Sequence, residues 1–292
     1  MKWPKLLKKT RKATIQMSNF WIRTISGTAY FAVLLAALLI NEFVFGAIAA
    51  IFTGVLAFEF CRLSDGASLK AGSVVSIVAS VCLFAMVYAC EVFGMQANYV
   101  SAVFFLMPVM LLTCLAKPSA IGMKTVAHDL ACLVYIALPM SLSTTLVFRG
   151  GEFDGSLLLS FFIMICCSDV GAYCIGTAFG QKKGSRKLCP EVSPLKSWAG
   201  FWGGLGFCIA AGVILGFTQL MNIPVIHSVA LSIIIHLGGT LGDLFESRWK
   251  RDAGVKDSGR IIPGHGGLLD RLDSSLIAIP AASAYLILFN LW

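Results

Sequence analysis

Residues 72–90 read GSVVSIVASVCLFAMVYAC, a run without a single charged side chain, and stretches of this kind decide the fold. About 20 mostly apolar residues in a helix cross about 30 Å of hydrocarbon. The same character recurs along the chain, whose 292 residues are 58% hydrophobic and only 13% charged. Soluble domains carry about twice that share of charged residues. The sequence therefore predicts an integral membrane protein.

The apolar runs predict about nine transmembrane helices. Only helices or closed barrels satisfy their backbone polar groups in lipid, and uninterrupted apolar runs lack the alternation of barrel strands. The predicted spans are residues 26–41, 43–60, 72–90, 99–116, 128–148, 156–177, 199–219, 225–243 and 274–291. We expect an all-α polytopic bundle, with a basic cytoplasmic segment at 1–25 and a single integral membrane catalytic domain at 26–292.

The basic residues predict which side of the membrane each loop faces. With the N-terminus in the cytoplasm and the sides alternating, 22 of the 23 Lys and Arg residues fall inside and only Arg149 falls outside. Cytoplasmic loops carry such an excess. We assign the net charge of +8 to contact with anionic lipid headgroups and not to nucleic acid. The prediction is a multi-pass protein of the cell (inner) membrane with its active site facing the cytoplasm.

Two predicted cytoplasmic segments, 178–198 and 244–273, concentrate the residues that carry chemistry. In the first, two prolines exclude a helix, and Ser193 and Lys196 come just before a helix that starts at Trp198. A helix N-terminus is a favourable place for phosphate. The lysines between 182 and 187 fit an ordinary positive-inside loop equally well.

The second segment belongs to the most charged stretch of the chain. Residues 243–273 hold six of the fifteen acidic residues and six of the twenty-three basic ones. Asp243 ends a long apolar run, where an ionised carboxylate is costly without a partner. Asp270 and Asp273 are spaced i, i+3, so in a helix they share a face. Three converging carboxylates would repel one another without a cation, and oxygen ligands suit Mg²⁺.

A glycine-rich run lies between these carboxylates. Residues 263–267 read PGHGG and predict a tight turn whose backbone amides approach a phosphate closely. Each feature alone has a plain structural explanation, since an Asp pair often caps a helix and a Gly pair often only makes a turn. Their concentration beside Lys250-Arg251 and Lys256-Asp257 favours a functional site.

The same residues form a pattern found in a known family. Residues 247–273 read SRWKRDAGVKDSGRIIPGHGGLLDRLD, which resembles the signature of the phosphatidate cytidylyltransferases, also called CDP-diacylglycerol synthases. The likeness extends to Ser168-Asp169, residues 193–200 and Gly242-Asp243. The first 150 residues match only as apolar spans with a basic start. Trp249 and Ser197 depart from the residues more common in the family, and neither is an expected ligand.

The resemblance implies an enzyme that makes CDP-diacylglycerol and pyrophosphate from CTP and phosphatidic acid. A lipid phosphate oxygen would attack the α-phosphorus of CTP in line, so no protein nucleophile is needed. Repulsion between the anionic substrates is the obstacle, and divalent cations with Lys or Arg side chains reduce it. The expected cofactor is Mg²⁺, either as two divalent cations or as one with a monovalent cation.

The resemblance also assigns roles to residues of this chain. The expected catalytic residues are Asp243, Asp270, Asp273, Lys250 and Arg251. The expected metal ligands are Asp243, Asp270 and Asp273, with Asp169 as a weaker candidate whose alternative is a helix–helix hydrogen bond. The expected substrate-binding residues are Ser193, Lys196, Lys256, Asp257, His265, Gly266, Gly267 and Arg271. For His265 a turn-stabilising role fits equally well. Arg248 and Arg260 are assigned to lipid headgroups, and Glu59 with Arg62 to a simple salt bridge.

Alternative functions stay open at this point. CTP could activate a different lipid phosphate, and a membrane ion transporter would use the intramembrane aspartates for ions. Against the transporter, the charge lies mostly on one side and no pair of matched broken helices is found. The glycine-rich run 202–206 would allow close packing either in a homodimer or within one subunit.

Overall fold

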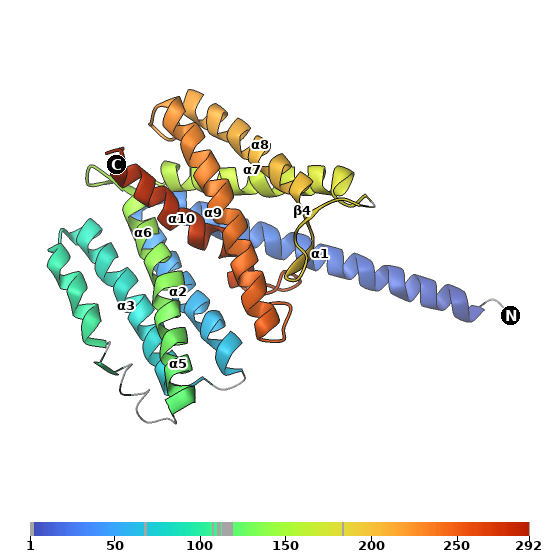
Figure 1. The fold of residues 1–292 in the computed structure, drawn as a ribbon, viewed down its shortest axis with the longest axis horizontal. Helices are drawn as coiled ribbons and strands as arrows, with labels where there is room; N and C mark the ends of the chain where they lie inside the picture. Colours follow the sequence, from blue (N-terminus) through green and yellow to red (C-terminus); the bar gives the residue numbers. More distant parts are fainter. Residues whose placement is uncertain are drawn as a thin grey trace.

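Long apolar helices dominate the computed structural model, which describes residues 3–66, 69–106, 108–109, 112, 119–182 and 184–291 (Figure 1). Among these residues, 8 helices are long and apolar enough to cross a membrane. They are α1 (Trp3–Leu39), α2 (Glu42–Asp65), α3 (Ala71–Phe93), α7 (Ser156–Phe179), α8 (Trp198–Phe217), α9 (Val225–Asp252), α10 (Leu269–Leu288) and the continuous run of α5 (Ser119–Cys132), η2 (Leu133–Ala137) and α6 (Leu138–Leu146). The predicted all-α membrane bundle is confirmed.

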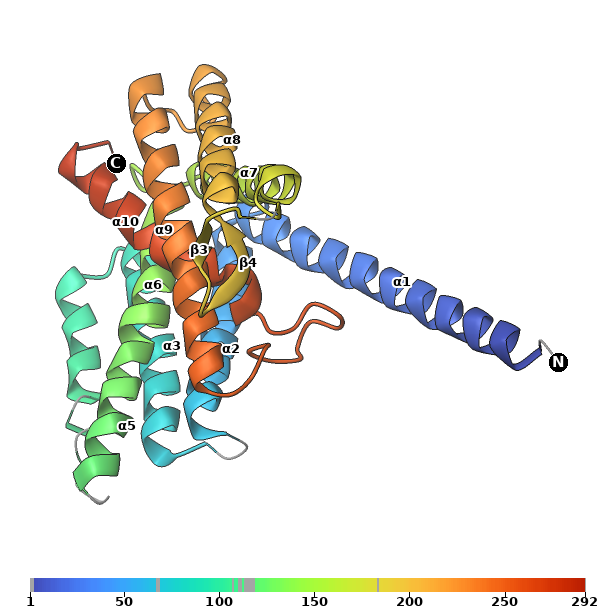
Figure 2. The same cartoon turned by 45° about the vertical axis from the view of Figure 1, so that its right-hand side comes forward.

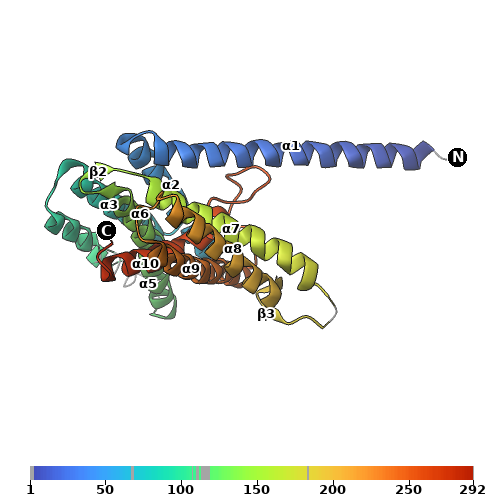
Figure 3. The same cartoon turned by 90° about the horizontal axis from the view of Figure 1, so that it is seen from above.

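Most predicted spans coincide with one of these helices. The predicted span 99–116 begins in the 3₁₀ helix η1 (Ala97–Phe105), and its remainder lies largely outside the described residues. The expected N-terminal segment and the first span form one continuous helix, α1, of 37 residues. This helix projects well past the bundle (Figures 1 and 3).

Small residues let α7 and α8 pack closely within one chain. A Cβ atom at Gly203 would come within 2.4 Å of the Ile175 side chain, and one at Gly171 within 2.6 Å of Phe207. Small residues at such positions let two helix backbones approach each other. Gly203 of the glycine-rich run 202–206 therefore serves packing inside the subunit, while a Cβ at Gly206 would meet open space.

Helices α9 and α10 cross in opposite directions where the charged segment begins. A Cβ at Gly238 would lie 2.9 Å from the Cα of Ala278, and one at Gly242 would lie 2.3 Å from the Asp273 carbonyl oxygen. The two backbones thus touch at Gly242 because it has no side chain. This contact sets the last turns of α9 against the first turn of α10 (Figures 1 and 2).

Two short hairpins mark opposite parts of the fold. Strand β3 (Lys187–Cys189) pairs with β4 (Ser193–Ser197), and this hairpin lies beside α9 in Figure 2. It occupies the proline-containing segment and leads directly into α8 at Trp198, as predicted. Elsewhere, β1 (Phe148–Arg149) pairs with β2 (Glu152–Phe153). Arg149 donates from there to the carbonyls of Met221 (2.8 Å) and Leu291 (3.1 Å).

Candidate active site

A cavity of about 600 Å³ lies between α7, α8, α9 and the β3–β4 hairpin. Much of its wall is apolar, with Ile165, Ala172, Leu188, Leu195, Phe201 and Ile235 among the lining residues. Asp169, Asp243 and Lys196 bring charge into the same cavity. Lys196 on β4 forms an ion pair with Asp243 on α9. The hairpin therefore places the Lys196 ammonium group beside the Asp243 carboxylate, at the end of the apolar part of α9.

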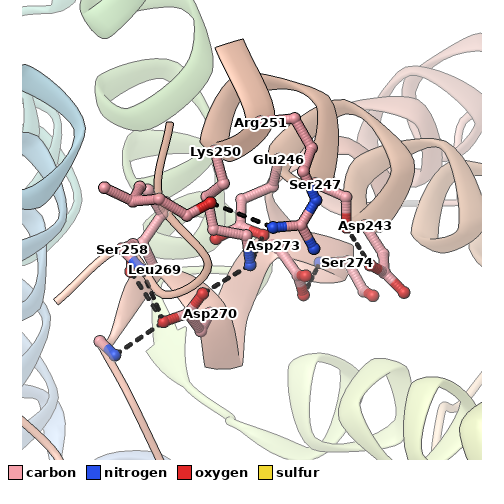
Figure 4. A network of polar contacts seen from close by, with 12 residues as sticks. Asp243, Glu246, Ser247, Lys250, Arg251, Ser258, Leu269, Asp270, Asp273 and Ser274 are labelled. Atoms are coloured by element: carbon pink, nitrogen blue, oxygen red, sulfur yellow. Dashed lines mark hydrogen bonds and ion pairs between the residues drawn. The ribbon is translucent and has the colours of Figure 1, made fainter. Parts of the chain in front are cut away.

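Asp273 joins this charged cluster from α10. Its position follows from the Gly242 crossing, and Asp243 and Asp273 are close enough for their charges to interact (Figure 4). The backbone N–H of Ser274 donates to Asp273 Oδ1 at 2.6 Å. On α7, Asp169 also lies within electrostatic reach of Asp243. Carboxylates from three helices thus gather around Lys196.

Asp270 meets a different set of partners. Its Oδ1 accepts a hydrogen bond from Lys250 Nζ at 2.6 Å. Its Oδ2 accepts from the backbone N–H of Ser258 (3.0 Å), the Ser258 hydroxyl (3.0 Å) and the N–H of Gly267 (2.8 Å). Lys250 also forms an ion pair with Glu246. All four acceptor contacts to Asp270 are therefore made within the protein, as Figure 4 shows.

Helix geometry explains why Asp270 and Asp273 have different partners. The two residues share the face of α10 that packs on α9, as the i, i+3 spacing predicts. Because α9 runs in the opposite direction, Asp273 lies against Gly242 and Asp270 reaches Lys250 further along α9. Residues 243 and 250 are seven positions apart, which is about two helical turns on one face. Asp273 therefore faces the Asp243 carboxylate, whereas Asp270 faces the Lys250 ammonium group.

The donor atoms of this cluster are compatible with Mg²⁺. Among the described residues, no group of three His, Cys, Asp or Glu side chains lies ready to hold a metal ion unaided. Mg²⁺ normally takes one or two carboxylates and completes its shell with waters and substrate phosphates. Asp243 and Asp273 provide such a pair of oxygen donors, whereas Asp270 is engaged with Lys250. The metal assignment remains a prediction.

A second hollow of about 740 Å³ lies between α1 and the loop from α9 to α10. Basic side chains dominate it, namely Arg23, Lys256, Arg260 and Arg271. Three other predicted site residues, Asp257, His265 and Gly266, also line it. From the sequence, Arg260 was expected to face lipid headgroups and Arg23 was not expected in the site. Together these cations suit a ligand with several negative charges.

Helix α1 holds the glycine turn from its outer side. Arg23 Nε donates to the Gly264 carbonyl at 2.9 Å, and Ser26 Oγ donates to the Pro263 carbonyl at 2.8 Å. Ser26 Oγ also lies 2.9 Å from His265 Nδ1. Partial burial and the positive charges of two nearby arginines lower the pKa of His265. In this structure His265 thus makes the turn-stabilising contact that was one of its two expected roles.

Other residues of the two predicted segments make contacts with backbone groups. Arg251 Nη1 donates to the Val255 carbonyl at 3.1 Å and braces the end of α9. Ser193 pairs with Cys189 at the start of β4. Lys187 donates to the Gly180 carbonyl at 3.0 Å, which ties the hairpin to the end of α7. These contacts give the residues structural roles in this conformation.

Two buried glutamates belong to the site and were not assigned to it from sequence. Glu246 pairs with Lys250. Glu59 of α2 accepts a hydrogen bond from the N–H of Leu269 (2.8 Å), and its Oε2 lies 3.3 Å from Ser258 Oγ. The predicted salt bridge between Glu59 and Arg62 is wrong, because Glu59 turns into the bundle while Arg62 is exposed. A Glu within an apolar helix was the signal that could have identified Glu59.

The fold and the charged cluster define a polytopic membrane protein in which acidic and basic side chains gather where α9 and α10 cross. The chain belongs to the cytidylyltransferase family, because the family's sequence profile matches residues 21–289.

Relatives of this chain carry a more specific name. The phosphatidate cytidylyltransferase of Haemophilus influenzae is 44% identical over 135 residues, that of Staphylococcus aureus (strain COL) 46% over 133, and that of Bacillus subtilis 41% over 128. Each match covers 44% of this chain and 45%, 48% and 46% of the respective relative. The chain thus matches about half the length of these relatives.

Proposed function

We propose that this chain transfers the cytidylyl group of CTP to phosphatidic acid, giving CDP-diacylglycerol and pyrophosphate at the cytoplasmic face of the cell inner membrane. The main support is the position of Asp243, Asp273 and Lys196 in and beside a largely apolar cavity. A lipid with a phosphate headgroup needs such a combination of apolar wall and charge. The names of the relatives point to the same substrates.

The basic hollow supports the second substrate. A nucleoside triphosphate carries several negative charges, and Arg23, Lys256, Arg260 and Arg271 line one pocket. Arg271 follows Asp270 directly and lies in the first turn of α10, and Asp273 of the same helix interacts electrostatically with Asp243, which lines the apolar cavity. We infer that the nucleotide phosphates and the lipid phosphate approach each other across this turn.

The proposed reaction needs no nucleophile from the protein. A phosphate oxygen of phosphatidate forms a bond to the α-phosphorus of CTP. The bond from that phosphorus to the oxygen shared with the β-phosphorus breaks. The electron pair leaves with pyrophosphate. Lys196, Lys250 and Arg271 would offset the negative charge of the reacting phosphates, with Arg271 able to bind two oxygens at once. Glu246 and Asp270 hold Lys250 in place for this role.

Asp243 and Asp273 would hold Mg²⁺ together with substrate phosphate oxygens. When bound, the ion supplies positive charge to both substrates and helps to stabilise the leaving pyrophosphate. In this structure, Lys196 neutralises the charge of Asp243. With a cation on the carboxylates, Lys196 would be available to bind a substrate phosphate as a compact positive charge.

The test incubates purified protein in detergent micelles with CTP labelled at the α-phosphate, Mg²⁺ and phosphatidic acid. We expect labelled lipid and one pyrophosphate per lipid. Asp243→Asn and Asp273→Asn should each lower kcat/KM by at least about 100-fold, the usual effect of losing a group that stabilises the transition state. The matched control is Asp252→Asn, because Asp252 lies exposed on α9 and pairs only with Arg248 among the described contacts.

Three results would count against parts of the proposal. Normal turnover in Asp273→Asn would remove the metal assignment. Labelled product with another lipid phosphate but not with phosphatidic acid would retain the family chemistry and refute the substrate. Ion flux across proteoliposomes without any product from CTP would refute the enzyme and favour a transporter.

A further inference from the structure

We propose that Glu59 of α2 is a positioning residue that holds the first turn of α10, and with it Asp270, Arg271 and Asp273, in the arrangement the reaction needs. The kinetic part of this inference rests on the proposed function, whereas its structural part does not. Glu59 lies 210 positions before Leu269 and is 1% exposed. Through Glu59, α2 forms hydrogen bonds with the segment that carries the signature residues.

The carboxylate of Glu59 caps the start of α10. Its Oε2 accepts the N–H of Leu269, the first residue of that helix, at 2.8 Å. The first N–H groups of a helix lack partners within the helix, and a negative charge is favourable at that end. The residue at the N-cap position, Leu268, makes no side-chain cap of its own. A side chain from a distant helix therefore does the work of a local cap.

Two glycines of the α9–α10 segment make room for this carboxylate. A Cβ atom at Gly259 would lie 2.1 Å from Glu59 Oε1, and one at Gly267 would lie 2.5 Å from Glu59 Oε2. Real Cβ contacts do not come this close, so any larger residue would displace the carboxylate or the loop. The Glu59 carboxylate thus lies between two parts of the loop, around Gly259 and around Gly267, and fixes the distance between them. The carboxylate therefore explains why both positions lack a side chain, which turn formation alone would not explain.

Ser258 connects Glu59 to Asp270. Its hydroxyl lies 3.0 Å from Asp270 Oδ2 and 3.3 Å from Glu59 Oε2. A hydroxyl has one proton to donate, so it can serve only one of the two carboxylates at a time. Asp270 in turn accepts from Lys250, which pairs with Glu246 (Figure 4). A shift of Glu59 would therefore be transmitted through Ser258 and Leu269 to the residue that orients Lys250.

The experiment compares three variants that separate reach from charge. Glu59→Gln keeps the length of the side chain and an oxygen for the Leu269 N–H. Glu59→Asp keeps the charge but withdraws the carboxylate by one carbon. Glu59→Ala removes both. The matched control is Glu152→Ala, because Glu152 is an exposed glutamate on β2 that shares a hollow with Glu42, at the opposite end of α2 from Glu59.

Kinetics provide the first readout. Positioning residues behind a reactive site typically change activity by about 10–100-fold. We expect Glu59→Ala to lower kcat by about that factor and to raise KM for CTP as well, since the loop and the helix turn that Glu59 holds line the basic hollow. Glu59→Gln should recover more of kcat than Glu59→Asp. The reverse order, or unchanged kcat in Glu59→Ala, would overturn the proposal.

A second readout needs no enzymatic activity. Trypsin cuts after Lys256 and Arg260, both in the loop that Glu59 anchors. We expect Glu59→Ala and Glu59→Asp to be cut there at least about ten times faster than the parent chain, because local opening exposes the loop. Glu59→Gln and Glu152→Ala should be cut at the parent rate. Equal cutting of all chains would overturn the positioning role even if the parent chain proved inactive with CTP. If Glu59→Ala does not fold, the Gln and Asp variants alone decide the question.

Discussion

Replacing Lys250 with Met removes the ammonium group that Glu246 and Asp270 share where α9 and α10 cross. The side chain of Lys250 is 12% exposed, and those of Glu246 and Asp270 are 1% and 5% exposed, so water cannot take over the role of the ammonium group without rearrangement. Removing one partner of a buried ion pair leaves an unbalanced buried charge and costs about 3–5 kcal/mol. We expect the free energy of unfolding to fall by about 4 kcal/mol, which is about a thousandfold in the unfolding equilibrium.

The assay follows unfolding of the purified protein in mixed micelles with increasing SDS, by circular dichroism. A double variant, Lys250→Met with Glu246→Gln, removes one of the two remaining charges and should be more stable than Lys250→Met alone by about 1–3 kcal/mol. The control is Arg248→Met on the same helix. Arg248 and Asp252 are 58% and 64% exposed, and such an i, i+4 pair contributes about 0.3–0.5 kcal/mol.

Two outcomes would refute this reasoning. The first is a loss of stability in Lys250→Met no larger than that in Arg248→Met, because the ammonium group would then not be compensating buried charge. The second is a double variant no more stable than the single one. That result would show that the remaining carboxylates do not repel each other in the folded protein.

Two further predictions concern packing and pH. Gly203→Ala should destabilise the protein because its Cβ would collide with Ile175, whereas Gly206→Ala should be neutral or stabilising by up to about 1 kcal/mol, as measured by thermal unfolding in detergent. The pKa of His265 in the folded protein is lowered below its ordinary value of 6.5. Just below pH 6.5 the unfolded chain therefore binds more protons than the folded protein, so the free energy of unfolding falls as the pH drops through that window. His265→Gln should flatten this dependence in unfolding curves recorded between about pH 5 and about pH 7.5, and an unchanged slope would contradict the assignment.

Much of the bundle could be predicted because membrane insertion depends on local composition. Residues 72–90 were predicted as a span, and α3 runs from Ala71 to Phe93. The boundaries near charge were less accurate. Helix α9 continues from its apolar part through Arg251 to Asp252, since an amphipathic end can leave the hydrocarbon and remain helical. Hydropathy measures where lipid contact ends and not where the helix ends.

The candidate site was predictable only in part. The apolar neighbourhood of Asp243 and the i, i+3 spacing of Asp270 and Asp273 identified residues that the structure brings to one helix crossing. Spacing alone could not show that Asp270 faces Lys250 while Asp273 faces Asp243. That difference depends on the direction of the opposing helix and on the register set by Gly242.

By itself, the sequence determined that this chain is a helical membrane protein with a concentrated acidic and basic cluster, because composition and residue spacing are local properties. The cytidylyltransferase character of that cluster came from the resemblance of residues 247–273 to a known family. Only the tertiary structure decided that Glu59 caps α10 and that Arg23 and Ser26 hold the glycine turn. Those contacts join residues more than 200 positions apart. They exist because particular glycines let helices and loops approach closely, and packing of that kind leaves no periodic trace along the chain.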